Sequence, residues 1–189
     1  MAAISNTTRA KVKFFVSYAH KNQALSDAFT VQLLELLGPS KNFAYKLWMD
    51  SAIVVGEGWK QQILTAKDEC DFGLLLVSPA FLNSEFIVEH ELPRFVGDKR
   101  APSIPVLLAK VDFRLHDLKG LEELQIFRYR GKRYTDFRSY AECKTGNPRH
   151  DFVFSLFESI ENKLATAALA KRTKGDETIS EASQETPPK

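Results

Sequence analysis

Residues 71–93, DFGLLLVSPAFLNSEFIVEHELP, join an uninterrupted apolar run to an amphipathic helical segment. The run DFGLLLVS has the length of a strand, and an apolar run without alternation is typical of a parallel strand covered on both faces. At about 100° per residue, Glu91 lies on the apolar side of the following segment, between Ile87 and Phe95. Isolated buried carboxylates are rare because their desolvation must be compensated. We therefore expect Glu91 at a rim, in a pair, or at a site of chemistry.

Strand-like runs alternate with helical segments along most of the chain. This alternation predicts an α/β fold, a flavodoxin-like three-layer sandwich with a central parallel sheet and right-handed crossovers. The expected strands are 12–17, 43–50, 71–78 and 104–112, and the expected helices are 22–37, 59–70, a helix capped by Ser84 that contains Glu91, and 150–168. The apolar stripes of the other three helices are Leu25, Ala28, Phe29, Leu33 and Leu36; Trp59, Ile63, Ala66 and Cys70; and Val153, Leu156, Ile160 and Leu164. Residues 113–148 receive no assignment.

One domain is expected, because 189 residues with 44% hydrophobic side chains can bury one substantial core. The predicted boundaries are a flexible N-terminus over residues 1–10, the folded domain over 11–168, and a disordered tail over 169–189, where apolar groups are few. The formal charge of +2 does not argue for nucleic acid or an anionic membrane as the main partner.

The cysteines and the apolar runs predict the compartment. Cys70 and Cys143 stand far apart and outside any CxxC spacing, which suits a reducing cytosol and predicts neither a disulfide nor a zinc site. No stretch has the apolar length of a signal peptide or of a membrane span. We therefore expect a cytoplasmic protein that does not engage a membrane.

Fingerprints of several other sites are absent. The chain has no GxGxxG, P-loop or GxSxG motif, and its four histidines lack metal-ligand spacing, so no metal site is expected. A response-regulator receiver is excluded, because SYAH (17–20) and SPAF (78–81) stand where it needs acidic residues. The segment FRYRGKRYTDFR (127–138) favours an edge strand or loop with its aromatics packed inward over a site for single-stranded nucleic acid. A contact with a partner protein is an equal alternative for this segment.

Three separated blocks resemble the Toll/interleukin-1 receptor (TIR) domain family in its bacterial form. They are FFVSYAH at 14–20, LWMD at 47–50 with Gly56 and Trp59 after it, and the block from Cys70 to Pro93. The blocks occur in the family's order, and the resemblance covers residues 11–168. It implies the family's flavodoxin-like fold, in which ligands bind beyond the carboxyl ends of the strands.

The resemblance also implies chemistry on NAD⁺. Many bacterial TIR domains cleave the bond between nicotinamide and ribose and release nicotinamide with ADP-ribose or a cyclic isomer. The family's catalytic glutamate lies in the helix after the third strand, which by position is Glu91. NAD⁺ is then a substrate, and no separate cofactor is implied. The positions that the resemblance assigns to NAD⁺ binding are Ser17, Tyr18, Ala19, Asp50, Val55, Gly56, Trp59 and Ile87.

Several of these positions also have a structural interpretation. Tyr18 can cap the end of its strand, Asp50 can brace its own loop, and Trp59 can anchor the core. Many catalytic relatives have a tryptophan four residues before the glutamate, where this chain has Ile87 with Phe86 beside it. A stacking partner for the substrate is therefore missing or displaced.

The resemblance implies partners as well as a substrate. TIR domains associate with one another, so we expect self-association and a separate sensor or effector protein. For a bacterial chain the resemblance suggests an antiphage or toxin-like effector that consumes NAD⁺ or makes a nucleotide signal. The alternative is a non-catalytic interaction module that signals through TIR–TIR association alone.

Overall fold

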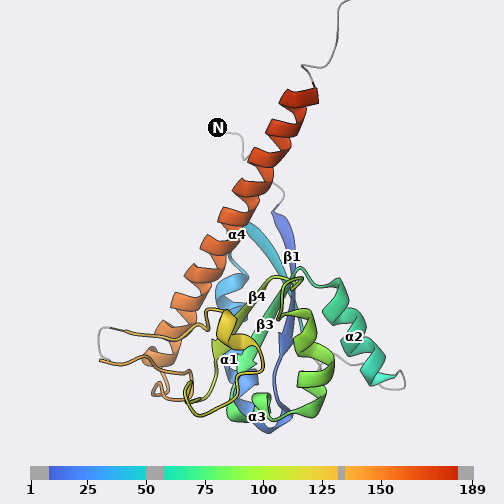
Figure 1. Ribbon diagram of the computed structural model, residues 1–189. Helices are drawn as coiled ribbons and strands as arrows, with labels where there is room; N and C mark the ends of the chain where they lie inside the picture. Colours follow the sequence, from blue (N-terminus) through green and yellow to red (C-terminus); the bar gives the residue numbers. More distant parts are fainter. Residues whose placement is uncertain (1–8, 50–57, 132–134, 183–189) are drawn as a thin grey trace, which may run out of the picture.

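A four-stranded parallel sheet forms the centre of the molecule, with the strand order β2-β1-β3-β4 (Figure 1). The computed structural model describes residues 9–49, 58–131 and 135–182, and residues 168–182 by their backbone alone. The strands are β1 (Ala10–Ser17), β2 (Phe43–Trp48), β3 (Phe72–Val77) and β4 (Ser103–Leu107). The helices are α1 (Gln23–Leu37), α2 (Trp59–Glu69), α3 (Pro79–Leu82) and α4 (Asn147–Ala182), with short turns η1 (His20–Asn22), η3 (Ile87–Glu91), η4 (Leu92–Arg94) and η5 (Leu121–Glu123). The predicted parallel α/β sheet is confirmed.

Helices cover both faces of the sheet and make three layers. Successive strand residues point to opposite faces, so Phe14 packs with α1 and α4 in one core while Phe15 packs with α2, α3 and η3 in the other. All six residues of β3 are buried, as expected of a strand covered on both sides. The predicted flavodoxin-like three-layer sandwich is therefore the observed architecture.

The buried stripes of the helices differ in detail from the expected ones. In α1 the prediction holds for Phe29 and Leu33, but Ala28 is exposed and Leu37 is fully buried where Leu36 is only partly so. In α2 only Ile63 is buried, Ala66 is partly buried, and the buried Cys70 follows the end of the helix at Glu69. Trp59 is 53% exposed, which excludes its interpretation as a core anchor.

The segment between β4 and α4, unassigned from sequence, covers the free edge of β4. Phe127 N–H donates to the Pro105 carbonyl at 2.7 Å, and Leu107 N–H donates to the Phe127 carbonyl at 2.9 Å. The inward packing predicted for residues 127–138 holds for Phe127 and Tyr129, which lie partly buried against the core. It is wrong for Phe137, which is 50% exposed. This edge is paired by single bridges rather than by a regular strand, so no periodic pattern marks it.

The helix α4 extends past the predicted end of the domain at residue 168. Its backbone is helical to Ala182, whereas the sequence predicts a structureless tail from 169. The stretch ATAALAKR (165–172) consists mainly of strong helix formers, which favours continuation of the helix. The predicted flexible N-terminus lies outside the described residues except for Arg9 and Ala10, the second of which begins β1. Within the described part of the chain, no helix has the length and apolar character needed to cross a membrane.

Gly73 of β3 allows the close approach of Phe95, and this contact generates a stability prediction. A Cβ atom at position 73 would lie 2.5 Å from a ring carbon of Phe95, whose ring is fully buried. We expect Gly73→Ala to lower the free energy of unfolding by about 3 kcal/mol, because the ring has no space to move. Urea denaturation measures this change.

Gly38 provides the matched control for that substitution. Its backbone is right-handed, and apart from its chain neighbours an added Cβ meets only the Leu34 carbonyl, at 3.4 Å, an ordinary contact. The entropic gain of replacing glycine by alanine is opposed by Pro39, which disfavours the right-handed conformation in a preceding residue with a Cβ. Gly38→Ala is therefore expected to change the free energy of unfolding by less than about 1 kcal/mol. Equal effects of the two substitutions would contradict the packing argument at Gly73.

Glu161 of α4 ties this helix to the start of β2. Its carboxylate accepts hydrogen bonds from the Ser40 and Tyr45 hydroxyls, both at 2.6 Å, and from the Asn42 amide at 3.0 Å. Burial by itself raises the pKa of the Glu161 carboxyl, but these three donors outweigh it and hold the pKa below its usual value. The ionised form of Glu161 therefore stabilises the fold.

This contribution should depend on pH. A carboxyl whose pKa is lower in the fold stabilises it above the unfolded pKa, about 4.3 for glutamate, and that stability is lost as the pH falls through the lower folded value. We expect Glu161→Gln to lower the free energy of unfolding by about 1 kcal/mol at pH 7, because the site is partly open to water. At pH 3 the difference from wild type should shrink, which urea titrations at both pH values can measure. A difference that is unchanged or larger at pH 3 would refute this role.

Candidate active site

A cavity of about 700 Å³ opens where the carboxyl ends of β1 and β3 meet α2, α3 and η3. In parallel α/β sheets this is the edge at which ligands bind, and the volume is in the usual range for small-molecule sites. The side chains around it are mainly apolar and aromatic, with a few polar groups between them. The lining residues are Phe15, Val16, Tyr18, Ala19, His20, Lys21, Trp48, Trp59, Ile63, Pro79, Ala80, Asn83, Ser84, Phe86, Ile87 and Glu91.

Glu91 is a buried carboxylate that is paired and also lines this cavity. Its side chain is only 6% exposed, and Ser17 Oγ, at the end of β1, donates a hydrogen bond to Glu91 Oε2. Ser17 is itself 1% exposed, so its hydroxyl has little access to water. The pair joins residues 74 positions apart in the chain and holds the carboxylate at the wall of the cavity. Of the three expectations for Glu91, the structure shows the pair, and the same carboxylate lines the cavity.

A π-helical turn presents Glu91 to the cavity. The expected Ser84 cap is present, since its hydroxyl accepts from Ile87 N–H at 3.4 Å. The turn η3 then widens, and Leu92 N–H donates five residues back to the Ile87 carbonyl. Pro93 has no N–H with which to continue an α-helical ladder, so the helix cannot resume its regular pattern there. Single π turns are frequent at functional sites because they redirect one side chain.

An aromatic wall lies next to the carboxylate. The ring centroids of Trp59 and Phe86 are 5.2 Å apart at 46°, and those of Phe86 and His90 are 5.0 Å apart at 69°. Ile87, the next residue after Phe86, is 3% exposed and also lines the cavity. The aromatic ring at this point of the cavity therefore belongs to Phe86. Phe86 was not predicted as a site residue, but the sequence did carry a signal for it, because Phe86 is an aromatic residue directly before position 87.

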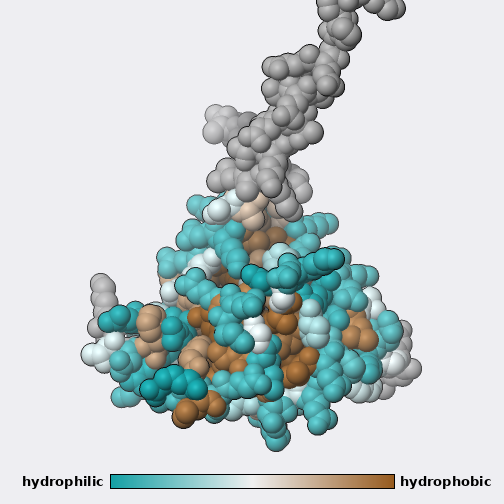
Figure 2. Space-filling view, in the orientation of Figure 1, coloured by the Kyte–Doolittle hydropathy of each residue, from teal (hydrophilic) through white to brown (hydrophobic). Residues whose placement is uncertain are grey.

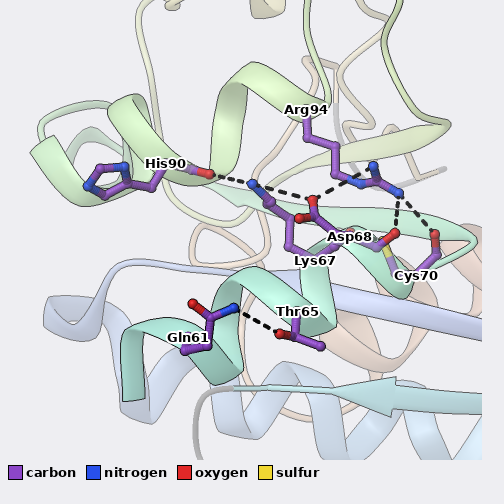
Figure 3. A network of polar contacts seen from close by, with 7 residues as sticks. All are labelled: Gln61, Thr65, Lys67, Asp68, Cys70, His90 and Arg94. Atoms are coloured by element: carbon purple, nitrogen blue, oxygen red, sulfur yellow. Dashed lines mark hydrogen bonds and ion pairs between the residues drawn. The ribbon is translucent and has the colours of Figure 1, made fainter. Parts of the chain in front are cut away.

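Polar contacts fix α2, which carries Trp59, against the turn that carries Glu91 (Figure 3). Lys67 Nζ donates to the His90 carbonyl at 2.8 Å, and Arg94 Nη2 donates to the Asp68 carbonyl at 2.8 Å. Nearer the cavity, Lys60 Nζ lies 3.0 Å from His90 Nε2. These contacts join α2 to η3 and η4.

Cys70 lies at the end of this network and has a structural role. Burial raises the pKa of its thiol, against the opposing effect of the Arg94 guanidinium. A thiol with a raised pKa is a poor nucleophile. The free cysteines Cys70 and Cys143 are both buried, and among the described residues no three His, Cys, Asp or Glu side chains form a group that could hold a metal ion.

The other strand end, at Ser78, is occupied by a helix cap. Ser78 Oγ accepts from Phe81 N–H at 3.0 Å and donates to Asn22 Oδ1 at 2.6 Å. This hydroxyl is therefore committed to joining α3 with η1. It supports the floor of the cavity without entering it, because Pro79 and Ala80 are the residues of this turn that line the cavity.

The structure brings most of the sequence-predicted site residues to one place. Tyr18, Ala19, Trp59, Ile87 and Glu91 line the cavity, and Ser17 reaches it through Glu91. The remaining three, Asp50, Val55 and Gly56, lie outside the described residues. The lining residues that sequence reasoning missed include His20, Lys21 and Asn83. His20 stands in FFVSYAH and Asn83 in the block from Cys70 to Pro93, but neither was assigned a place in the site, and only the fold brings them together with Lys21.

Comparison with known families agrees with this architecture. A family model for the TIR domain matches residues 14–145, more than half of the chain, and the match contains both Ser17 and Glu91. It ends just before α4 begins at Asn147. A search of the curated proteins finds no match. On the strength of the family match and the parallel three-layer fold, this chain belongs to the TIR domain family.

Proposed function

We propose that this protein is an NAD⁺ glycohydrolase or cyclase that cleaves the nicotinamide–ribose bond, with Glu91 as the catalytic residue. The observation that carries the proposal is the Glu91 carboxylate, hydrogen-bonded by Ser17 and lining a cavity with an aromatic wall. Burying a carboxylate to 6% exposure costs free energy, so a carboxylate kept beside a cavity favours a chemical role. NAD⁺ is the substrate in this proposal, and no resident cofactor or metal takes part.

The chemistry needs one carboxylate. The nicotinamide leaving group is already a cationic pyridinium, so the bond to ribose breaks with its electron pair going to the ring nitrogen, and no general acid is required, unlike ordinary glycoside cleavage. Glu91 stabilises the oxocarbenium-like charge at the anomeric carbon, and a site shielded from water strengthens this attraction. The same carboxylate orients the attacking water, or an adenine nitrogen in a cyclase. Water then gives ADP-ribose and a released proton.

The wall of the cavity provides the binding surface for the substrate. Trp59 and Phe86 offer flat apolar rings to a nucleotide base or to nicotinamide. Tyr18 and Ala19, both 6% exposed, line the cavity directly after β1. Phe86 takes the part that tryptophan has at the next position in many relatives.

We also propose how the activity is controlled. TIR domains in general associate with one another, and assembly of several copies, brought together by a separate sensor or effector protein, would activate this one. An antiphage or toxin-like role in the cytoplasm is the biological setting that fits such an enzyme. An isolated dilute sample is then expected to turn over slowly.

The second candidate function is a non-catalytic module that signals by TIR–TIR association. The observation that favours it is Ile87, which leaves the usual tryptophan position without an aromatic ring. A module of this kind would keep the fold and the self-association and would release no nicotinamide. The experiment below separates the two functions.

Glu91→Gln tests the proposed enzyme. We expect the substitution to lower nicotinamide release by about 100-fold or more, because it removes the charge that stabilises the transition state while an amide oxygen still accepts from Ser17. The assay is chromatography of NAD⁺, nicotinamide and the second product, with the full chain concentrated or crowded to force assembly. The retention of the second product distinguishes ADP-ribose from a cyclic isomer.

Glu89→Gln is the matched control, since Glu89 lies in the same π turn but is exposed. It should release nicotinamide at the wild-type rate. If assembled wild-type protein releases none, or if Glu91→Gln releases as much as wild type, the enzymatic proposal fails and the interaction module is favoured.

Ser17 is a positioning residue for Glu91, and this role makes a separate prediction. Ser17→Ala should lower kcat by about tenfold, typical of the loss of a hydrogen bond to a charged group, with KM changed less than about twofold. The kcat of Ser17→Cys should lie between those of wild type and Ser17→Ala, because a thiol is of similar size to a hydroxyl and is a weaker hydrogen-bond donor. Steady-state kinetics with matched circular dichroism spectra measure both. A rise in KM with unchanged kcat would assign Ser17 to direct substrate binding instead.

A further inference from the structure

Arg128, in the segment between β4 and α4, rests on two exposed aromatic rings. Its Cζ lies 4.9 Å from the ring centroid of Phe113 and 4.5 Å from that of Phe137. Arg130 adds a second guanidinium, with its Cζ 5.8 Å from the same Phe137 ring. Stacking of this kind holds the guanidinium plane by its faces, while the N–H donors remain at its edge.

Within the described part of the chain, neither of these two arginines has an acidic partner. Among the described residues, no carboxylate lies within ion-pair distance of Arg128 or Arg130, whereas the nearby Arg138 pairs with Glu142 at 3.9 Å. The printed sequence places five basic residues and one acidic residue in 127–138, so this short segment carries more net positive charge than the +2 of the whole chain. The result is a preorganised cationic group with no carboxylate beside it among the described residues.

Apolar side chains are exposed in the same segment. Leu115 is 80% exposed, the highest value among the large hydrophobic residues that the structure describes. Its loop is ordered by Asp112, whose carbonyl accepts from His116 N–H at 3.0 Å and whose carboxylate accepts from Arg114 N–H at 2.9 Å. Figure 2 shows hydrophobic side chains among hydrophilic ones at the lower left of the molecule, where Figure 1 draws the segment between β4 and α4. We call Phe113, Leu115, Arg128, Arg130 and Phe137 the Arg128 surface.

The chemistry of this surface selects the class of partner. Single-stranded nucleic acid binds by stacking bases on aromatic faces, but the Arg128 guanidinium already occupies a face of the Phe113 ring and of the Phe137 ring. A carboxylate needs only the edge of the guanidinium, which it binds through two parallel hydrogen bonds. The exposed Leu115 suits an apolar side chain beside that carboxylate.

We propose that the Arg128 surface docks an acidic segment of a partner protein, with a carboxylate on Arg128 and a neighbouring apolar side chain on Leu115. The surface lies beyond the β4 edge of the sheet, on the side of the molecule away from α2, which flanks the cavity (Figure 1). A partner docked here leaves the cavity open. The proposal goes beyond the proposed function and does not depend on Glu91.

Fluorescence anisotropy with the full chain tests the docking. The probe is a short fluorescein-labelled peptide of alternating Glu and Leu, compared with the same peptide carrying Gln in place of Glu and with labelled oligothymidylate. We expect the acidic peptide to bind and the Gln peptide to bind at least about tenfold more weakly. Arg128→Gln should lower the affinity for the acidic peptide by about tenfold or more, as expected for an arginine at the centre of an interface. Arg128→Lys should weaken it nearly as much, because lysine keeps the charge and loses the planar fork.

Lys46→Gln is the control for charge alone, since Lys46 is exposed on β2, at the other edge of the sheet. It should leave the affinity unchanged, and Leu115→Ser should weaken it. Equal binding of the two peptides, or of wild type and Arg128→Gln, overturns the proposal. Tighter binding of oligothymidylate that is lost in Arg128→Gln assigns the surface to nucleic acid. A change of sedimentation coefficient in Arg128→Gln without peptide assigns it to a second copy of the chain.

Discussion

The complete burial of β3 is the constraint on which the rest of the structure depends. A strand whose six residues are all buried requires helices on both faces of its sheet. Parallel neighbouring strands are joined by crossover connections, and the helices in these connections cover the two faces. Gly73 then permits Phe95 to close over the strand. Because the strands run parallel, their carboxyl ends meet at one edge, and the helices that leave them enclose the cavity there.

Burial of Glu91 follows from that arrangement and sets the chemistry of the cavity. The carboxylate is tolerated because β1 ends beside it and offers the Ser17 hydroxyl. The π turn before Pro93 carries the Glu91 side chain inward. The hydrogen bonds of Lys67 and Arg94 hold α2 against η3 and η4. The fold itself therefore supplies a hydrogen-bond partner for this buried charge.

The cavity and the Arg128 surface lie at different parts of the fold. The cavity is built by regular elements that meet at the strand ends, whereas the Arg128 surface is built by an irregular segment that covers the β4 edge. Regular elements hold a reacting group accurately, and irregular segments vary without disturbing the core. Substitutions in the Arg128 surface can therefore leave the cavity unaltered.

Local pattern in the sequence determined the parallel α/β architecture, the position of Glu91 after the third strand, and the family, because strand and helix periods and short motifs are properties of neighbouring residues. Only the tertiary structure decided what each group meets. The partnership of Ser17 with Glu91 joins residues 74 positions apart, and the cavity position of Phe86 depends on the packing of Trp59 against it. Likewise, Phe137 is exposed and contacts Arg128, although the sequence of its segment predicts inward packing. The direction of this side chain is set by an isolated bridge between Tyr129 and Arg138, and not by a repeating pattern in the sequence. Contacts between distant segments leave no local period, which is why the sequence alone could name the carboxylate and could not name its partners.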